Sequence, residues 1–158
     1  VNMFERFLIW ISNPLTCGRP ITTLPPSSLG TTSLADVMCA ASLSLHFLLV
    51  LDEENRPMDD PDRCRYLQLV RDAIDNCARH HDQRQGRNVF LESVSGDGIN
   101  SNTPSSRLFC PGHSIEVAWF LLKMCDVVGG SAIHEEMALS ALEGSLNLGW
   151  DEDYGGLL

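Results

Sequence analysis

The sequence predicts an all-α fold in which helix pairs stand side by side as part of a larger ring, with a short β-hairpin among the loops. Two observations lead to this prediction. Apolar residues recur at helical spacing along about five segments. The loops between these segments are alternately short and long, which is typical of helix pairs whose longer loops gather at one face of a ring. Because so few helices cannot close a ring, residues 1–158 are expected to form a single partial domain, the central part of a larger one.

The first two helices are separated by a long loop. The first is expected over Met3 to Ile11, where apolar residues return every three or four positions. Proline and glycine are frequent over residues 13–32, which predicts a loop. Ser33 then suits an N-cap, with Asp36 at the capping-box position, and the second helix is expected to continue to about Leu51.

The middle of the chain combines a helix with extended structure. Pro61 suits the first turn of a third helix. The last turn of that helix carries side chains whose positive charge favours the helix dipole, namely Arg79, His80 and His81. Residues 88–95 change to a period of two, which predicts a short strand. The Ser-Gly-Asp-Gly sequence at residues 95–98 predicts a hairpin turn after it.

Two further helices and a loop are predicted in the C-terminal third. Pro111 starts the fourth helix, which is expected to end at about Val128 because Gly129-Gly130 follows. Ser131 suits the N-cap of the fifth helix, which continues to about Leu148. Residues 149–156 are rich in glycine and aspartate, so they are expected to form a loop.

The composition argues against several classes of partner. The chain has 158 residues, with 21 acidic and 11 basic side chains and a formal net charge of −10. Such a surface repels phosphate, so neither nucleic acid nor a membrane is expected as a partner. The only lysine is Lys123, and the sequence contains no GxxxxGK[ST] loop for phosphate. We also expect no segment with the roughly 18 apolar residues that span a bilayer.

The cysteines and the N-terminus indicate a cytoplasmic location. Six cysteines are scattered without a CxxC pair, so they are expected to be reduced thiols, and no metal site is expected. The chain begins at Val1 within a helical pattern and without the basic and small-residue features of a secretory signal. We therefore expect it to be a piece of a longer protein.

The segment from Cys110 to Leu122 carries the strongest indication of chemistry. Pro111 starts a helix, and His113 falls in its first turn, where backbone N–H groups point outward. Glu116 lies three residues later on the same face. The two residues predict a general base and a carboxylate that steers it or binds substrate. A helix cap would explain the same pair without catalysis.

The whole string, CPGHSIEVAWFLL, resembles the motif of the N-acylglucosamine 2-epimerase family, also known as renin-binding proteins. The resemblance extends over most of the chain. Four further stretches match it in order, namely Trp10 with Gly18-Arg19-Pro20, Leu34 to Met38, Leu91 to Gly98, and Gly149 to Gly156. Methionine at position 38 resembles the residue found in the N-acetylglucosamine branch of the family rather than that of the cellobiose branch. The chain departs from the family at Cys110, where asparagine is common.

The resemblance implies an (α/α)6 barrel and reversible epimerisation of N-acetylglucosamine and N-acetylmannosamine at C2. His113 would be one of two histidines that transfer protons, and the second would lie beyond Leu158, so this chain alone is expected to be inactive. Glu116 would bind sugar hydroxyls or steer His113. The family requires no cofactor, although a nucleotide such as ATP is an effector in some members. The full-length protein would be a homodimer with an amino-sugar substrate.

Three more residues are candidates for substrate binding. Glu92 on the predicted strand is expected to face the centre of the ring, and Trp150 in the glycine-rich loop is expected to line the site. Arg19 could contact a substrate or an effector, with a surface position in the loop as the alternative. Trp119 could line a sugar site or fill the core, and the core position is favoured because Trp119 belongs to the apolar stripe of its helix.

Two other functions stay open. A non-catalytic module that binds a protein, such as a renin-type protease, would not need the second histidine. An enzyme that cleaves glycosides would need two carboxylic acids that flank the bond, and Glu116 has no clear acidic partner in a comparable loop. Isotope exchange at C2 of the sugar without cleavage would distinguish the epimerase from the cleaving enzyme.

Overall fold

The computed structural model describes residues 3–11, 31–95 and 104–158, and within these ranges the five predicted helices are confirmed. They are α1 (Met3–Ile11), α2 (Leu34–Glu53), α3 (Pro61–His80), α4 (Pro111–Val128) and α5 (Ala132–Gly149). Two short 3-10 helices, η3 (Arg84–Gly86) and η4 (Ser105–Arg107), lie in the connections. The mostly helical architecture agrees with the predicted fold class.

The ends of the helices follow local signals in the sequence. Asp60 caps α3 by accepting hydrogen bonds from two backbone N–H groups of its first turn. Gly129 ends α4 in the left-handed conformation with φ of 72°, which glycine adopts without strain. Ser33 and Ser131 occupy the predicted N-cap positions, but neither side chain makes a capping hydrogen bond. The Ser33 side chain therefore does not make its part of the expected capping box.

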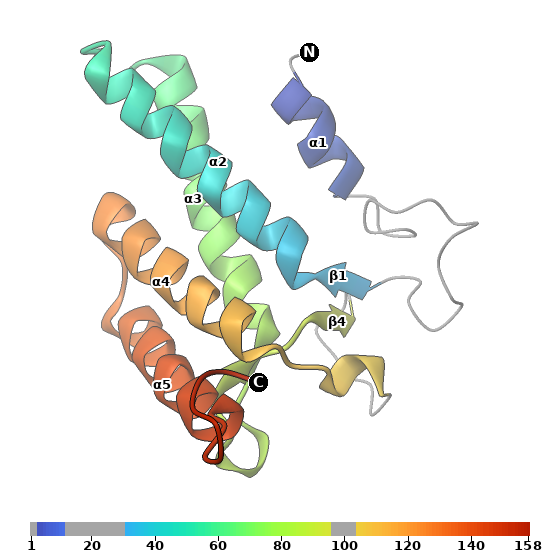
Figure 1. The fold of residues 1–158 in the computed structure, drawn as a ribbon. Coiled ribbons are helices and arrows are strands. Elements are labelled where there is room, and N and C mark those ends of the chain that lie inside the picture. Colours follow the sequence, from blue (N-terminus) through green and yellow to red (C-terminus); the bar gives the residue numbers. More distant parts are fainter. Residues whose placement is uncertain (1–2, 12–30, 96–103) are drawn as a thin grey trace.

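The helices form two antiparallel hairpins, α2 with α3 and α4 with α5 (Figure 1). α4 also packs against α2 and α3, which joins the hairpins into one body. Helices α2 and α4 begin at the end of the molecule where α3 and α5 finish (Figure 1). We call this end, with residues 31–34, 89–95 and 108–114, the loop end. The connection between α2 and α3, residues 52–63, forms the far end.

Within the described ranges, four short strands lie at or near the loop end, in two separate sheets. Strand β1 (Thr31–Ser33) pairs antiparallel with β4 (Ser93–Ser95), and β2 (His81–Asp82) pairs antiparallel with β3 (Val89–Phe90). Extended structure over residues 88–95 is thus confirmed, but it is divided between two partners. The partner of β4 is β1, and Thr32 pairs with Val94, 62 residues later in the sequence. Local sequence patterns do not predict a pairing over this separation. The expected turn at residues 95–98 lies largely outside the described residues.

The hydrophobic core lies between the two hairpins. Fully buried side chains come from α2, α3 and α4 and from strand β3, among them Leu34, Val70, Phe90, Leu121 and Met124. α1 is attached through Phe4, whose ring centroid lies 5.3 Å from that of Phe47. Trp119 is 53% exposed, so its predicted core position is wrong. Helix α4 turns Val117 and Leu121, rather than Trp119, toward its neighbours.

Several large apolar side chains remain on the surface. On α2 and α5 the exposed ones are Leu43, Leu49, Val50, Ile133, Leu139, Leu146 and Leu148. By length and composition α2 could cross a membrane, so the expectation that no segment is long and apolar enough is wrong for this helix. Core helices of globular proteins share this composition, and α2 packs against α3 and α4.

Candidate functional site

His113 lies in the first turn of α4, as the sequence predicts. The next residue, Ser114, fixes this turn, because its fully buried Oγ accepts the backbone N–H of Phe90 at 2.9 Å. The same Oγ lies 2.7 Å from Oγ of Ser145 on α5. Sequence reasoning did not single out Ser114, since a lone serine in a helix carries no signal of a partner on another element. The start of α4 is therefore tied to a strand and to a second helix.

Glu92 is held by backbone hydrogen bonds to two other segments. Its N–H donates to the carbonyl of Leu108 at 2.9 Å, and its carbonyl accepts the N–H of Leu34 at 2.9 Å. The preceding Leu91 forms an antiparallel bridge with Phe109. The Glu92 side chain therefore starts from a backbone that is tied both to the first residue of α2 and to the segment that leads into α4.

The side chains of His113 and Glu92 meet at the loop end. Nδ1 of His113 lies 3.0 Å and 3.2 Å from the two carboxylate oxygens of Glu92. Because a carboxylate only accepts hydrogen bonds, Nδ1 carries the proton in this pair, and Nε2 of a neutral ring is left as the proton acceptor. The Glu92 side chain is 17% exposed and that of His113 is 46% exposed, so the ring stays accessible from solvent.

The carboxylate beside His113 differs from the one that the helix spacing suggested. Within the described ranges, Glu92 is the acidic residue found in hydrogen-bonding distance of the imidazole, whereas Glu116 is exposed one turn further along α4. Spacing along a helix places Glu116 near His113 but does not show where either side chain points. Glu92 is 21 residues away in the sequence and becomes a neighbour only through the strand pairings of the loop end.

His80 hydrogen-bonds to the backbone of the residue that precedes Glu92. Its side chain is fully buried, with Nδ1 2.7 Å from the carbonyl of Leu91 and Nε2 3.2 Å from the hydroxyl of Thr32. Burial lowers the pKa of His80 to about 4, so the ring is neutral near pH 7. The interpretation of His80 as a charged side chain at a helix C-terminus is therefore wrong. Its neutral ring links α3 to the segment that carries Glu92.

Trp150 lies beside the start of α4, at the end of α5. A Cβ atom on Gly149 would overlap the ring of Pro111, so this glycine allows α5 to approach the first residue of α4. Trp150 follows, 48% exposed, and pairs with Leu157 in a small turn that closes the chain. The loop predicted over residues 149–156 is thus found next to the site, and Arg19 lies outside the described residues.

Cys110 adds a third reactive side chain to the site. It occupies the N-cap position of α4, immediately after Phe109. Its Sγ, an imidazole nitrogen of His113 and a carboxylate oxygen of Glu92 all lie within 4.8 Å of one another. Sulfur, nitrogen and oxygen donors in this arrangement could hold a divalent cation. Sequence patterns do not predict such a set, because its members come from separate segments and lack a paired spacing.

The chain is similar to curated proteins over nearly all of its length. It is 33% identical to "N-acylglucosamine 2-epimerase" of Homo sapiens and 30% identical to the protein of that name from Rattus norvegicus, over 161 residues in each case. The predicted resemblance to the N-acylglucosamine 2-epimerase family is confirmed. No family model matches the chain.

The similarity has a defined extent. Each of these alignments covers 99% of this chain but only 34–35% of the relative. The chain therefore spans about a third of the length of the epimerases that it matches. That third contains the His113–Glu92 pair at the loop end.

Proposed function

We propose that this chain forms part of an epimerase that interconverts N-acetylglucosamine and N-acetylmannosamine in the cytoplasm. The observation that carries the proposal is the pair of His113 and Glu92, with Nδ1 directed at the carboxylate and no partner for Nε2 among the described residues. The similarity to proteins named N-acylglucosamine 2-epimerase supports the choice of reaction.

The proposed chemistry needs one base at a defined position. In the open-chain sugar, the aldehyde at C1 makes the proton on C2 acidic. Nε2 of His113 accepts this proton, and the electron pair of the C–H bond becomes part of an enolate-like intermediate. The Glu92 carboxylate orients the ring and stabilises the imidazolium through the proton on Nδ1. Return of a proton to the opposite face of C2 completes the inversion, and we assign this step to a second histidine outside the chain.

We further propose that the two hairpins are successive helix pairs of an (α/α)6 barrel. Helices α2 and α4 start at the same end and would form one layer, with α3 and α5 in the other (Figure 1). The exposed apolar side chains of α2 and α5 would then pack against further helices of the ring. In this arrangement the loop end faces the substrate.

Glu116, Trp150 and Arg19 are proposed to complete substrate binding. Glu116 and Trp150 are both exposed; Glu116 belongs to α4, and Trp150 directly follows α5, whose last residue Gly149 lies against Pro111. A carboxylate and an aromatic ring suit the hydroxyl groups and the apolar face of a sugar. We propose that the full-length protein acts as a homodimer and requires no cofactor, with a nucleotide such as ATP as an effector.

Deuterium exchange at C2 tests the role of His113. The protein used is the longer one that includes the second histidine. The variant His113→Asn should reduce incorporation of solvent deuterium by about 10²–10⁴-fold, while sugar affinity stays within about tenfold, because a proton-transfer group is lost rather than a binding contact. The control is His134→Asn, since His134 contacts only Ser131 among the described residues, at the exposed start of α5. Exchange that persists in His113→Asn would remove this residue from the mechanism.

A further inference from the structure

We propose that Glu92, Cys110 and His113 form a binding site for a thiophilic divalent cation of the zinc type. Their ligand atoms lie within 4.8 Å of one another. No second group of three histidine, cysteine or acidic side chains in such proximity is found within the described ranges. This inference does not depend on the proposed epimerase reaction.

The donor set fits the preferences of zinc. Zn²⁺ binds thiolate sulfur, imidazole nitrogen and carboxylate oxygen, and its usual geometry is tetrahedral. Bonds of about 2.0–2.3 Å place neighbouring ligand atoms roughly 3.3–3.6 Å apart. The His113 and Glu92 atoms, at 3.0 Å, are already close to this separation. Because the ligand atoms lie within 4.8 Å of one another, no separation in the group has to close by more than about 1.5 Å, a distance that rotation of a side chain covers.

The backbone holds the three ligands in place without the metal. Glu92 is tied through its N–H to Leu108 at 2.9 Å, two residues before Cys110. The carbonyl of Cys110 accepts the N–H of Ser114 at 3.0 Å, and Ser114 in turn anchors the turn that carries His113. Because each ligand belongs to a hydrogen-bonded segment, little conformational entropy remains to be lost on binding.

The fourth coordination position would be open. The His113 side chain is 46% exposed, and three protein ligands leave a tetrahedral ion one position for water or a small molecule. The cation would occupy the space between His113 and Glu92, where it replaces the proton that now links Nδ1 to the carboxylate. A bound cation and the proposed proton transfer by His113 would therefore exclude one another, a consequence that rests on the proposed function.

Cobalt substitution tests the site directly. Co²⁺ is added to the metal-free chain, because a thiolate bound to cobalt produces a charge-transfer band in the near ultraviolet. We expect one Co²⁺ per chain with this band, and displacement by Zn²⁺. The variant Cys110→Asn carries the residue common in the family and should lose the band and at least about 100-fold in affinity, as removal of a ligand costs more than removal of an outer contact. The control is Cys39→Ala, which removes an exposed thiol outside the group.

The outcomes separate the metal site from the proposed reaction. Absence of the band in the unmodified chain, or its retention in Cys110→Asn, would overturn the metal site. Loss of the band to the same extent in Cys39→Ala would overturn it as well, and circular dichroism of each variant shows that it is folded. If the band is present while Zn²⁺ leaves deuterium exchange of the longer protein unchanged, the metal site stands and His113 is not the base.

Discussion

The two ends of the α2–α3 hairpin both carry acidic side chains beside cationic or titratable ones, but they use them in opposite ways. Helix α2 has 20 residues and is therefore about 30 Å long, which separates the two ends. At the far end the guanidinium groups of Arg56 and Arg63 are each paired with a carboxylate, although the buried Nε of Arg63 has no hydrogen-bond partner among the described residues. At the loop end Nδ1 of His113 pairs with Glu92, and the His113 side chain is 46% exposed.

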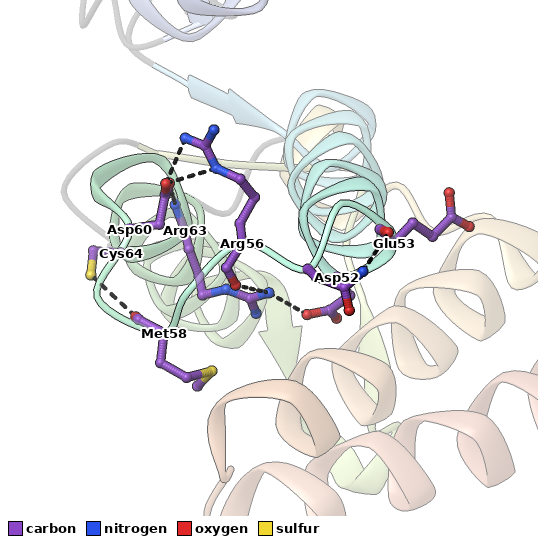
Figure 2. Close-up of polar contacts among 8 residues, drawn as sticks. Asp52, Glu53, Arg56, Met58, Asp60, Arg63 and Cys64 are labelled. Carbon is purple, nitrogen blue, oxygen red and sulfur yellow. Dashed lines mark hydrogen bonds and ion pairs between the residues drawn. The ribbon is translucent and has the colours of Figure 1, made fainter.

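The far end contains a network of ion pairs and hydrogen bonds (Figure 2). Oδ1 of Asp60 caps α3 by accepting the N–H groups of Asp62 and Arg63, and Oδ2 accepts Nε of Arg56 at 2.8 Å. The buried guanidinium of Arg63 pairs with Asp52. Burial raises the pKa of Asp60, but the hydrogen bonds from Arg63 and Arg56 outweigh that effect, so its pKa is lowered overall.

The comparison shows that carboxylates have different roles at the two ends, depending on whether the partner is an arginine or a histidine. Arginine remains charged at every physiological pH, so the carboxylates of the far end are fixed partners that join α2 to α3. The partner of Glu92 is an imidazole, a side chain that can transfer protons and bind metals. The loop end therefore combines a rigid backbone with a side-chain pair that can change its state.

The pH dependence of unfolding should give the largest effect on stability, and it concerns His80 at the loop end. Burial lowers the pKa of His80 from 6.5 to about 4. An unfolded chain takes up this proton as the pH falls through 6.5, whereas the folded chain resists until about 4. The contribution of the neutral ring is thus complete above pH 6.5 and is lost toward pH 4, on the order of 3 kcal/mol. Urea unfolding at several pH values measures it.

The variant His80→Gln isolates this effect. His81 titrates with the same sign, because burial lowers its pKa too, and it remains in the variant. The pKa of Asp82 is lowered by Arg84 and Arg87 despite burial, so its contribution is lost only below the ordinary carboxyl range. If His80→Gln keeps the full loss of stability between pH 6.5 and 4, buried His80 is not its source.

Substitution of Ser114 should have the next largest effect and tests whether the loop end is rigid. The variant Ser114→Ala leaves the buried N–H of Phe90 without its acceptor, which should cost about 1–3 kcal/mol in the free energy of unfolding. The control is Ser44→Ala, because the hydrogen bond of the buried Ser44 hydroxyl within the described residues goes to the carbonyl of Ala40 in its own helix, at 2.7 Å. An equal cost in both variants would show that the link between α4 and β3 contributes nothing.

The helices were predictable because their signals are local. Pro61 and Pro111 mark the starts of α3 and α4, and Gly129 marks the end of α4, since each residue imposes its own backbone conformation. His113 was found for the same reason, as part of a continuous string at a helix start. These predictions needed no knowledge of contacts between distant segments.

The partners of His113 could not be predicted because they are not local. Glu92 follows Leu91, and Cys110 follows Phe109. The bridge between Leu91 and Phe109 therefore brings both Glu92 and Cys110 close to His113. The sequence indicated Glu116 instead, because spacing along one helix was the available guide. Trp119 was misplaced for a related reason, since an apolar stripe does not show which side of a helix has neighbours in this chain.

The smallest effect is expected from Asp60 at the far end, and it sharpens the comparison. The variant Asp60→Ala removes the cap of α3 and the partner of Arg56, so the thermal midpoint should fall by about 2–4 °C. The variant Asp60→Asn keeps a good capping side chain and should lose less. Cobalt affinity should be unchanged in both, because Asp60 lies one length of α2 away from Cys110. If Asp60→Ala lowers the thermal midpoint as expected and also weakens cobalt binding, that result would contradict the independence of the two ends, because a change at the far end would then alter the site at the loop end.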